Sequence, residues 1–154
     1  MSSPPARKVH IVLSWLCRLV LGVLFIYAGF TKVYPPEHRF MFEMTLSTYQ
    51  LLPDWGVIVV ARVLPWLEMA LGATLIAGWI QRTIATFTTL LLGFFIGAMA
   101  LTYSRGIEAN CGCFGFGEAI SPFTLTRDSL LLLMAVFLAV QAWRAQPAGA
   151  PQPE

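Results

Sequence analysis

The stretch IVLSWLCRLVLGVLFIYAGFTKV, residues 11–33, is apolar except for Arg18 near one end and Lys32 near the other. As a helix it is long enough to cross about 30 Å of hydrocarbon, with both cations reaching outward to the membrane surfaces. It is too long for the apolar core of a signal peptide, and no small-x-small cleavage site follows it. The sequence therefore predicts a first membrane span here.

Composition extends this interpretation to the whole chain. Of 154 residues, 57% are hydrophobic and 12% are charged, about half the charged share of a soluble domain. Three further apolar runs are long enough to span a membrane: residues 56–80, 84–103 and 125–144. We therefore predict an all-α protein, an integral membrane four-helix bundle over residues 11–144, between disordered tails at 1–10 and 145–154.

Details between the spans refine this prediction. Pro35 and Pro36 end the first span, and the mixed polar and apolar residues 37–52 predict a short interfacial helix. Thr124 or Thr126 is the expected cap of the last span. The spacing of Gly93 and Gly97 allows two membrane helices to approach closely.

Charge predicts the orientation only weakly, because five Lys and Arg residues fall on each side of the four spans. Arg7 and Lys8 precede the first span, which often dominates orientation. On this basis we expect cytoplasmic termini, a periplasmic loop before the last span, and a multi-pass location in the inner membrane. The net charge of +2 without a basic run interleaved with aromatics gives no reason to propose nucleic acid as a partner.

The loop before the last span contains Cys111–Gly112–Cys113, two of the three cysteines. Extended residues at i and i+2 lie about 6.6–7.2 Å apart at Cα, the upper limit for a disulfide, and Gly112 provides the freedom to bend. A bridge over so short a loop would be labile, so we predict a redox-active pair. A structural bridge or two inert thiols is the alternative. Two sulfurs can also bind copper, but no methionine or histidine adjoins them, and no metal site is predicted.

Four cations are expected on the same face as this loop: Lys32, Arg62, Arg105 and Arg127. A nearby cation lowers the pKa of a thiol. Arg105, six residues upstream of Cys111, is the favoured candidate.

Glu68 and Cys17 lie inside predicted membrane spans and require an interpretation. Glu68 lies near the middle of the second span, where an acid is either functional or protonated and hydrogen-bonded within the bundle. Cys17 belongs to the opposite end of the first span, too far from the loop to exchange with its cysteines. We expect Cys17 to be structural.

Five short segments occur together in one order: AGFTK at 28–32, TYQLLP at 48–53, LPWLE at 64–68, CGCFG at 111–115 and RD at 127–128. Their order resembles the MauE/DoxX family of membrane proteins, in particular its MauE-like branch, over about residues 19–140. The resemblance implies a four-helix bundle in the inner membrane that works beside periplasmic redox proteins. For the MauE branch it implies help to a thioredoxin-like partner in forming disulfides during methylamine utilisation, and for the DoxX branch quinone-coupled sulfur oxidation.

The arrangement is also similar to DsbB and the vitamin K epoxide reductases, which generate disulfides with quinones on four-helix cores. Those enzymes relay electrons between two cysteine pairs or through a Cys-x-x-Cys that faces a quinone. This chain has one Cys-x-Cys and no second pair. It cannot run that relay alone.

We therefore predict a membrane thiol–disulfide redox protein. Cys111 and Cys113 exchange with a periplasmic thioredoxin-like partner, Cys111 reacts first as the more solvent-directed sulfur, and a quinone is a candidate electron acceptor. The supporting residues are Lys32, Arg62, Glu68, Arg105 and Arg127. Two other classes stay open: a non-enzymatic scaffold subunit of a redox or sulfur-oxidation complex, and a small-solute or metal transporter with a polar path through Glu68 and Arg62.

Overall fold

The computed structural model describes residues 5–114 and 117–145, and these form five α-helices without a strand. The helices are α1 (Pro5–Val33), α2 (Glu37–Thr48), α3 (Asp54–Ala77), α4 (Gln81–Ser104) and α5 (Pro122–Arg144). All but α2 are long and apolar enough to cross a membrane. The prediction of an all-α four-helix membrane bundle, with a short helix between the first two spans, is confirmed.

Two helix starts differ from the sequence prediction. Helix α1 begins at Pro5, so residues 5–10 are helical rather than part of a tail, because proline is tolerated in a first turn and no breaker follows it. Helix α5 is capped by Ser121, whose Oγ accepts from the Thr124 backbone N–H at 3.2 Å, and not by Thr124 or Thr126. Pro122 has no N–H and takes the first helical position, so the cap falls one residue earlier. The expected tails at 1–4 and 146–154 lie outside the described residues.

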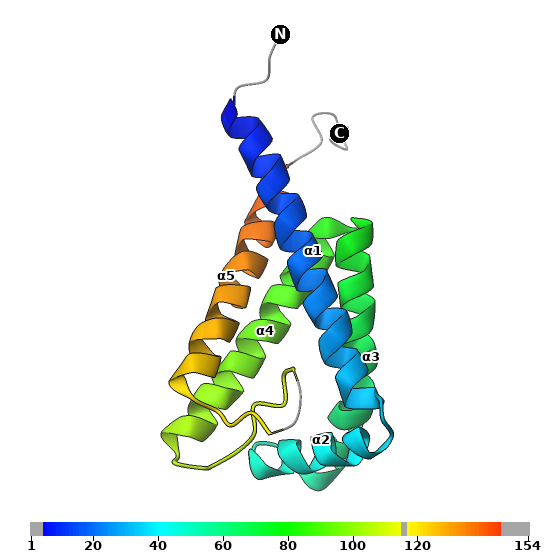
Figure 1. The fold of residues 1–154 in the computed structure, drawn as a ribbon, viewed down its shortest axis with the longest axis vertical. Helices are drawn as coiled ribbons and strands as arrows, with labels where there is room; N and C mark the ends of the chain where they lie inside the picture. Colours follow the sequence, from blue (N-terminus) through cyan, green and yellow to red (C-terminus); the bar gives the residue numbers. More distant parts are fainter. Residues whose placement is uncertain (1–4, 115–116, 146–154) are drawn as a thin grey trace, which may run out of the picture.

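The four spans form two pairs (Figure 1). Helix α1 makes its most extensive contacts with α3, and α4 makes its own with α5. Helix α2 lies across one end of the bundle and packs against α3 and α1. The loop between α4 and α5 lies at this same end, opposite the first turns of α1 and the last turns of α5. The topology therefore brings the cysteine loop onto α2 and the lower ends of all four spans.

Glycines permit the close approach of α1 to α3. A Cβ atom on Gly22 would lie 2.9 Å from the carbonyl oxygen of Gly72, and a Cβ on Gly72 would lie 2.5 Å from that of Gly22. Around Gly93 and Gly97, in contrast, nothing lies within 4 Å of an added Cβ. The close approach that this spacing allows is not used within the described part of the chain, because the face of α4 that carries these two glycines is open.

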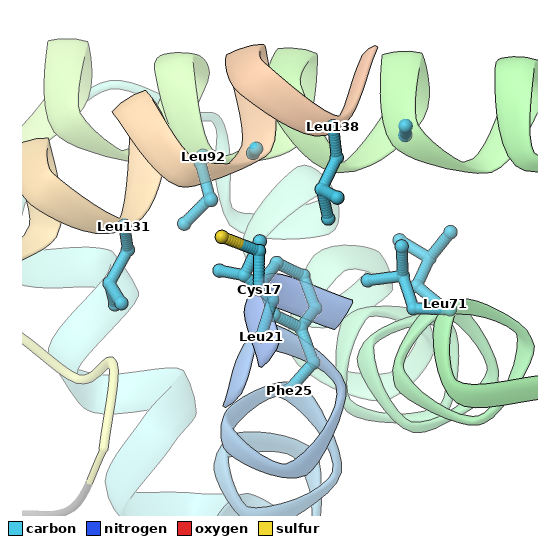
Figure 2. Packing of buried hydrophobic residues seen from close by; sticks show 10 residues of the cluster. Cys17, Leu21, Phe25, Leu71, Leu92, Leu131 and Leu138 are labelled. Carbon is cyan, nitrogen blue, oxygen red and sulfur yellow. The ribbon is translucent and has the colours of Figure 1, made fainter. Parts of the chain in front are cut away.

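The centre of the bundle is a cluster contributed by all four spans (Figure 2). Cys17 and Leu21 of α1 lie among Leu92 of α4 and Leu131 and Leu138 of α5. Cys17 is buried there, as expected for a structural cysteine. Many large apolar side chains on the outer faces are exposed, including Leu90, Phe94, Leu130 and Leu133. Outward apolar faces on four long helices are the arrangement that a bilayer requires.

Candidate functional site

The cysteine loop is folded back on itself rather than freely flexible. Asn110 and Ala119 form an isolated antiparallel bridge, flanked by hydrogen bonds from the Cys111 N–H to the Glu118 carbonyl (2.7 Å) and from the Ile120 N–H to the Ala109 carbonyl (3.0 Å). This pairing returns the chain to the start of α5. As a result, Cys111 lies against the first turns of that helix.

Gly112 turns the chain between the two cysteines. Its φ is +66°, in the left-handed region that glycine enters without strain, and a Cβ there would lie 3.2 Å from Cγ2 of Thr45 on α2. The expected bend at this residue is therefore present, and the lack of a side chain lets the turn sit against α2.

The two thiols are free and unequally exposed. Cys111 is buried, with 4% of its surface exposed, whereas Cys113 is partly exposed. As a residue, Cys111 is the more buried of the two, because the folded-back loop presses it against α5, and the prediction that its sulfur is the more solvent-directed stays untested. The two Sγ atoms and one carboxylate oxygen of Asp128 all lie within 4.8 Å of one another.

A methionine from α4 completes a group of three sulfurs. The Sδ of Met99 lies 3.5 Å from the Sγ of Cys111 and 4.0 Å from that of Cys113. Met99 is fully buried, at 0% exposure. We refer to Met99, Cys111 and Cys113 as the sulfur cluster.

Arg127 is the cation that lies beside the thiols. Its Nη2 lies 3.8 Å from the Sγ of Cys111, its Nη1 donates to both carboxylate oxygens of Glu118 at 2.9 Å, and its Nε donates to Oδ1 of Asp128 at 3.0 Å. Asp128 is itself buried. These partners fix the guanidinium in position next to Cys111.

Arg105, the cation that the sequence favoured, is exposed at the C-cap of α4. Within the described residues no hydrogen bond or ion pair joins it to either cysteine. Arg105 is close to Cys111 in sequence but is not joined to it in the structure, because the bridge between Asn110 and Ala119 places Cys111 against the first turns of α5, where Arg127 lies.

The pKa values of the two thiols move in opposite directions. A hydrogen bond from the Cys113 thiol lowers the pKa of Cys111, against the opposing effects of burial and of the Asp128 carboxylate, and the charge of Arg127 adds a smaller lowering effect. Donating that hydrogen bond raises the pKa of Cys113 well above its ordinary value, and desolvation adds to the rise. Cys111 is therefore the more acidic thiol of the pair.

Lys32 and Glu68 form a buried ion pair behind the loop. The Nζ of Lys32 lies 2.8 and 2.7 Å from the two carboxylate oxygens of Glu68, and only 2% of Lys32 is exposed. The same Nζ donates to the backbone carbonyl of Cys113 at 3.2 Å. The expectation that Lys32 reaches outward to the membrane surface was therefore wrong, because the carboxylate of Glu68 and the loop carbonyl hold it inside.

Arg62, the remaining supporting candidate, lies away from this site. It is exposed and lines a surface groove between α2 and α3 together with Arg39 and Glu43. The structure thus brings together Lys32, Glu68 and Arg127 with the two cysteines, and it does not bring Arg62 or Arg105 to them.

Tyr49 ties the loop to the end of α2. Its hydroxyl lies 3.0 Å from the Asn110 carbonyl and 2.9 Å from that of Cys111, and only 5% of the residue is exposed. Burial raises the pKa of Tyr49, and the negative charge of the neighbouring cysteines and of Asp128 raises it further. The hydroxyl therefore stays protonated and donates to the loop.

A small cavity of about 30 Å³ lies behind Cys113, lined by apolar side chains and by Lys32, Glu68 and Asp128. This volume holds one or two water molecules. It does not hold a quinone ring, so no step is assigned to a quinone here. A quinone acceptor stays a prediction.

Sequence reasoning missed several residues of this site: Tyr49, Met99, Glu118 and Asp128. Asp128 was the most accessible to prediction, because an acid in the second turn of a membrane span needs a partner. Tyr49 and Met99 carried no comparable signal, since an aromatic residue near a membrane surface and a methionine in an apolar helix are both common.

Comparison with known proteins identifies relatives over most of the chain. The family described as methylamine utilisation protein MauE matches residues 11–141. The MauE proteins of Paracoccus denitrificans and Paracoccus versutus are 31% identical over 137 residues (87% of this chain and 72% of theirs) and 33% identical over 141 residues (90% and 74%). Protein TlpB of Flavobacterium psychrophilum is 32% identical over 135 residues, covering 83% of this chain and 35% of that protein. No solved structure matches significantly.

Proposed function

Because the chain belongs to the family of the methylamine utilisation protein MauE, we propose that this multi-pass membrane protein donates a disulfide from Cys111 and Cys113 to a thioredoxin-like partner. One observation carries the proposal. Two neighbouring thiols have unlike surroundings, with Cys111 buried beside Arg127 and Cys113 partly exposed.

These surroundings suit a particular order of exchange. In the oxidised pair, a partner thiolate attacks the Sγ of Cys113, the less buried residue of the two, the bond between the two sulfurs breaks, and Cys111 leaves as a thiolate. A leaving thiol with a lower pKa departs faster, and Arg127 lies 3.8 Å from the sulfur that receives the charge. The sequence-based order, in which Cys111 reacts first, is revised accordingly.

The second half of the exchange releases the partner. Its second thiolate attacks its own sulfur in the mixed disulfide, and Cys113 leaves and takes a proton. Two electrons have then passed from the partner to the pair, leaving one partner disulfide and the reduced pair, and the protons are exchanged with solvent. The relatives are named for methylamine utilisation, and we extend that setting to this chain, with a partner that matures periplasmic proteins.

Trapping of the mixed disulfide tests this order. With the remaining loop cysteine converted to its mixed disulfide with thionitrobenzoate, Cys113 in Cys111→Ser is expected to be attacked by a reduced thioredoxin-like protein, with release of thionitrobenzoate, at least ten times faster than Cys111 in Cys113→Ser. The adducts are quantified by non-reducing electrophoresis and mass spectrometry in detergent. Cys17→Ser is the matched control, because Cys17 is buried in the bundle core, and it should exchange like the unmodified protein.

The outcomes separate the candidate functions. Adducts mainly through Cys111 would reverse the proposed order. Normal partner oxidation but failed complex assembly in both loop variants would favour the scaffold. The transporter has little support, since Glu68 is paired with Lys32 and Arg62 lies in a separate surface groove.

A further inference from the structure

We propose that the sulfur cluster binds one Cu(I) ion when both cysteines are reduced. This inference goes beyond the exchange reaction, because it requires the dithiol form and a third residue, Met99, to which the exchange gives no role. The sequence offered no thioether beside the cysteines, and the fold supplies one from α4.

Geometry is the first support. Three sulfurs arranged around one metal ion at about 2.3 Å each lie about 4 Å from one another. The Met99 sulfur lies 3.5 and 4.0 Å from the two cysteine sulfurs, and those two lie within 4.8 Å of each other. The three sulfurs are thus spaced for a three-coordinate ion with only small side-chain shifts.

The donor types select the metal. Thiolate and thioether sulfurs are soft ligands that favour Cu(I), whereas zinc takes Cys, His, Asp and Glu in proteins. A zinc ion here would use the two cysteines and Asp128, which also lie close together. Met99 therefore distinguishes the two metals, because only Cu(I) gains from its sulfur.

Charge and surroundings also suit a monovalent ion. Binding of Cu(I) displaces the two thiol protons, so the two thiolates and the ion carry one net negative charge. Arg127 lies 3.8 Å from the Cys111 sulfur and offsets part of the negative charge there, although it is shared with Glu118 and Asp128. Lys32 and Tyr49 donate hydrogen bonds to the backbone carbonyls of Cys113 and Cys111, respectively. These bonds order the loop in the metal-free protein. Because Cys113 is partly exposed, an ion can reach the sulfur cluster from solvent past this residue.

A buried methionine is ordinarily a packing residue that fills irregular gaps, and that role alone predicts no metal affinity. The test is a titration of the purified, reduced, full-length protein with Cu(I) under anaerobic conditions, in competition with bathocuproine disulfonate. We expect one Cu(I) per chain, and an X-ray absorption spectrum with three sulfur neighbours at about 2.3 Å. Met99→Leu should weaken binding at least tenfold and leave two sulfur neighbours.

Met134→Leu is the matched control, because Met134 packs against the core cluster on α5, and the same volume-conserving change should leave the affinity unchanged. Zinc affinity should be the same in the unmodified protein and in Met99→Leu. Equal Cu(I) affinity in these two proteins, or unmodified protein that binds no better than cysteine-alkylated protein, would overturn the proposal.

Disulfide exchange measured in copper-free buffer separates this proposal from the proposed function. Met134→Leu, which lies outside the sulfur cluster, should oxidise the partner normally. Three-sulfur Cu(I) binding without any exchange would support the copper site and remove the exchange function. Exchange without Cu(I) binding would support the exchange function and overturn the copper site.

Discussion

Cys111 and Cys113 are two residues apart and face different partners. Cys111 is pressed against α5 beside Arg127, and Cys113 remains partly exposed with its carbonyl bound by Lys32. A hydrogen bond between the thiols makes one sulfur more acidic at the expense of the other. The chemical asymmetry of the pair therefore comes mainly from their own contact, with the neighbouring cation as an addition.

This origin of the acidity predicts a pH effect. The pKa of Cys111 is lowered first by the Cys113 donor, so in Cys113→Ala the thiolate should form only at higher pH than in Cys113→Ser, which keeps a hydroxyl donor. The measurement is the pH dependence of the iodoacetamide alkylation rate in a Cys17→Ser background. Identical midpoints in the two variants would assign the lowered pKa to Arg127 instead.

The buried ion pair of Lys32 and Glu68 predicts a strong stability effect of single substitutions. Lys32→Met leaves the Glu68 carboxylate buried without its cation, which costs about 3–5 kcal/mol. The double variant Lys32→Met with Glu68→Leu removes both charges and should recover most of that loss. Unfolding in detergent micelles measures both. A double variant as unstable as the single one would mean that Lys32 acts chiefly through the Cys113 carbonyl.

The residues of the site were only partly predictable from the sequence. The cysteine pair is recognisable by residue type, and the order of the spans predicts Lys32 and Arg127 at the loop end, with Glu68 near the middle of its span. Which cation meets which anion depends on the rotation of each helix about its axis, which the sequence does not contain. The sequence alone does not show whether Arg105 or Arg127 lies beside Cys111. The pairing of Asn110 with Ala119 in the folded structure places Arg127 there.

At the scale of elements, the packing of α1 on α3 predicts different effects for two similar glycine substitutions. Gly72→Ala places a methyl group 2.5 Å from the Gly22 carbonyl oxygen, so the helices must separate, and overpacking of this kind costs about 1–3 kcal/mol. Gly93→Ala meets nothing within 4 Å and should be neutral or slightly stabilising. Thermal unfolding in the same detergent compares them. Equal stability of the two variants would show that α1 and α3 separate without cost.

The helices themselves were the most predictable part of the molecule, because each span is a long apolar run that only a helix can satisfy in lipid. Their partners were less predictable. The Gly-x-x-x-Gly spacing in α4 would allow a close helix contact, yet the close contact in the structure forms through Gly22 and Gly72. A spacing of small residues shows where a helix can be approached closely. Whether another helix lies there depends on the packing of the whole bundle.

At the scale of the whole molecule, the four spans separate the chain into two ends with different roles. One end carries the first turns of α1 and the last turns of α5, and the other carries α2 and the cysteine loop (Figure 1). A disulfide persists outside the cytoplasm and is reduced within it. The proposed exchange therefore requires the end with the loop to face the periplasm, a condition that the balanced basic charges at the two ends do not impose.

Labelling of single cysteines in intact cells tests that orientation. In a chain without native cysteines, Ser104→Cys, at the loop end of α4, should react with a membrane-impermeant maleimide. Trp79→Cys, exposed at the turn between α3 and α4, should react only after the cells are permeabilised. The opposite pattern would place the loop in the reducing cytoplasm, where disulfide donation has no oxidising environment to sustain it, while a Cu(I) site of two reduced thiols and a thioether would remain chemically competent there.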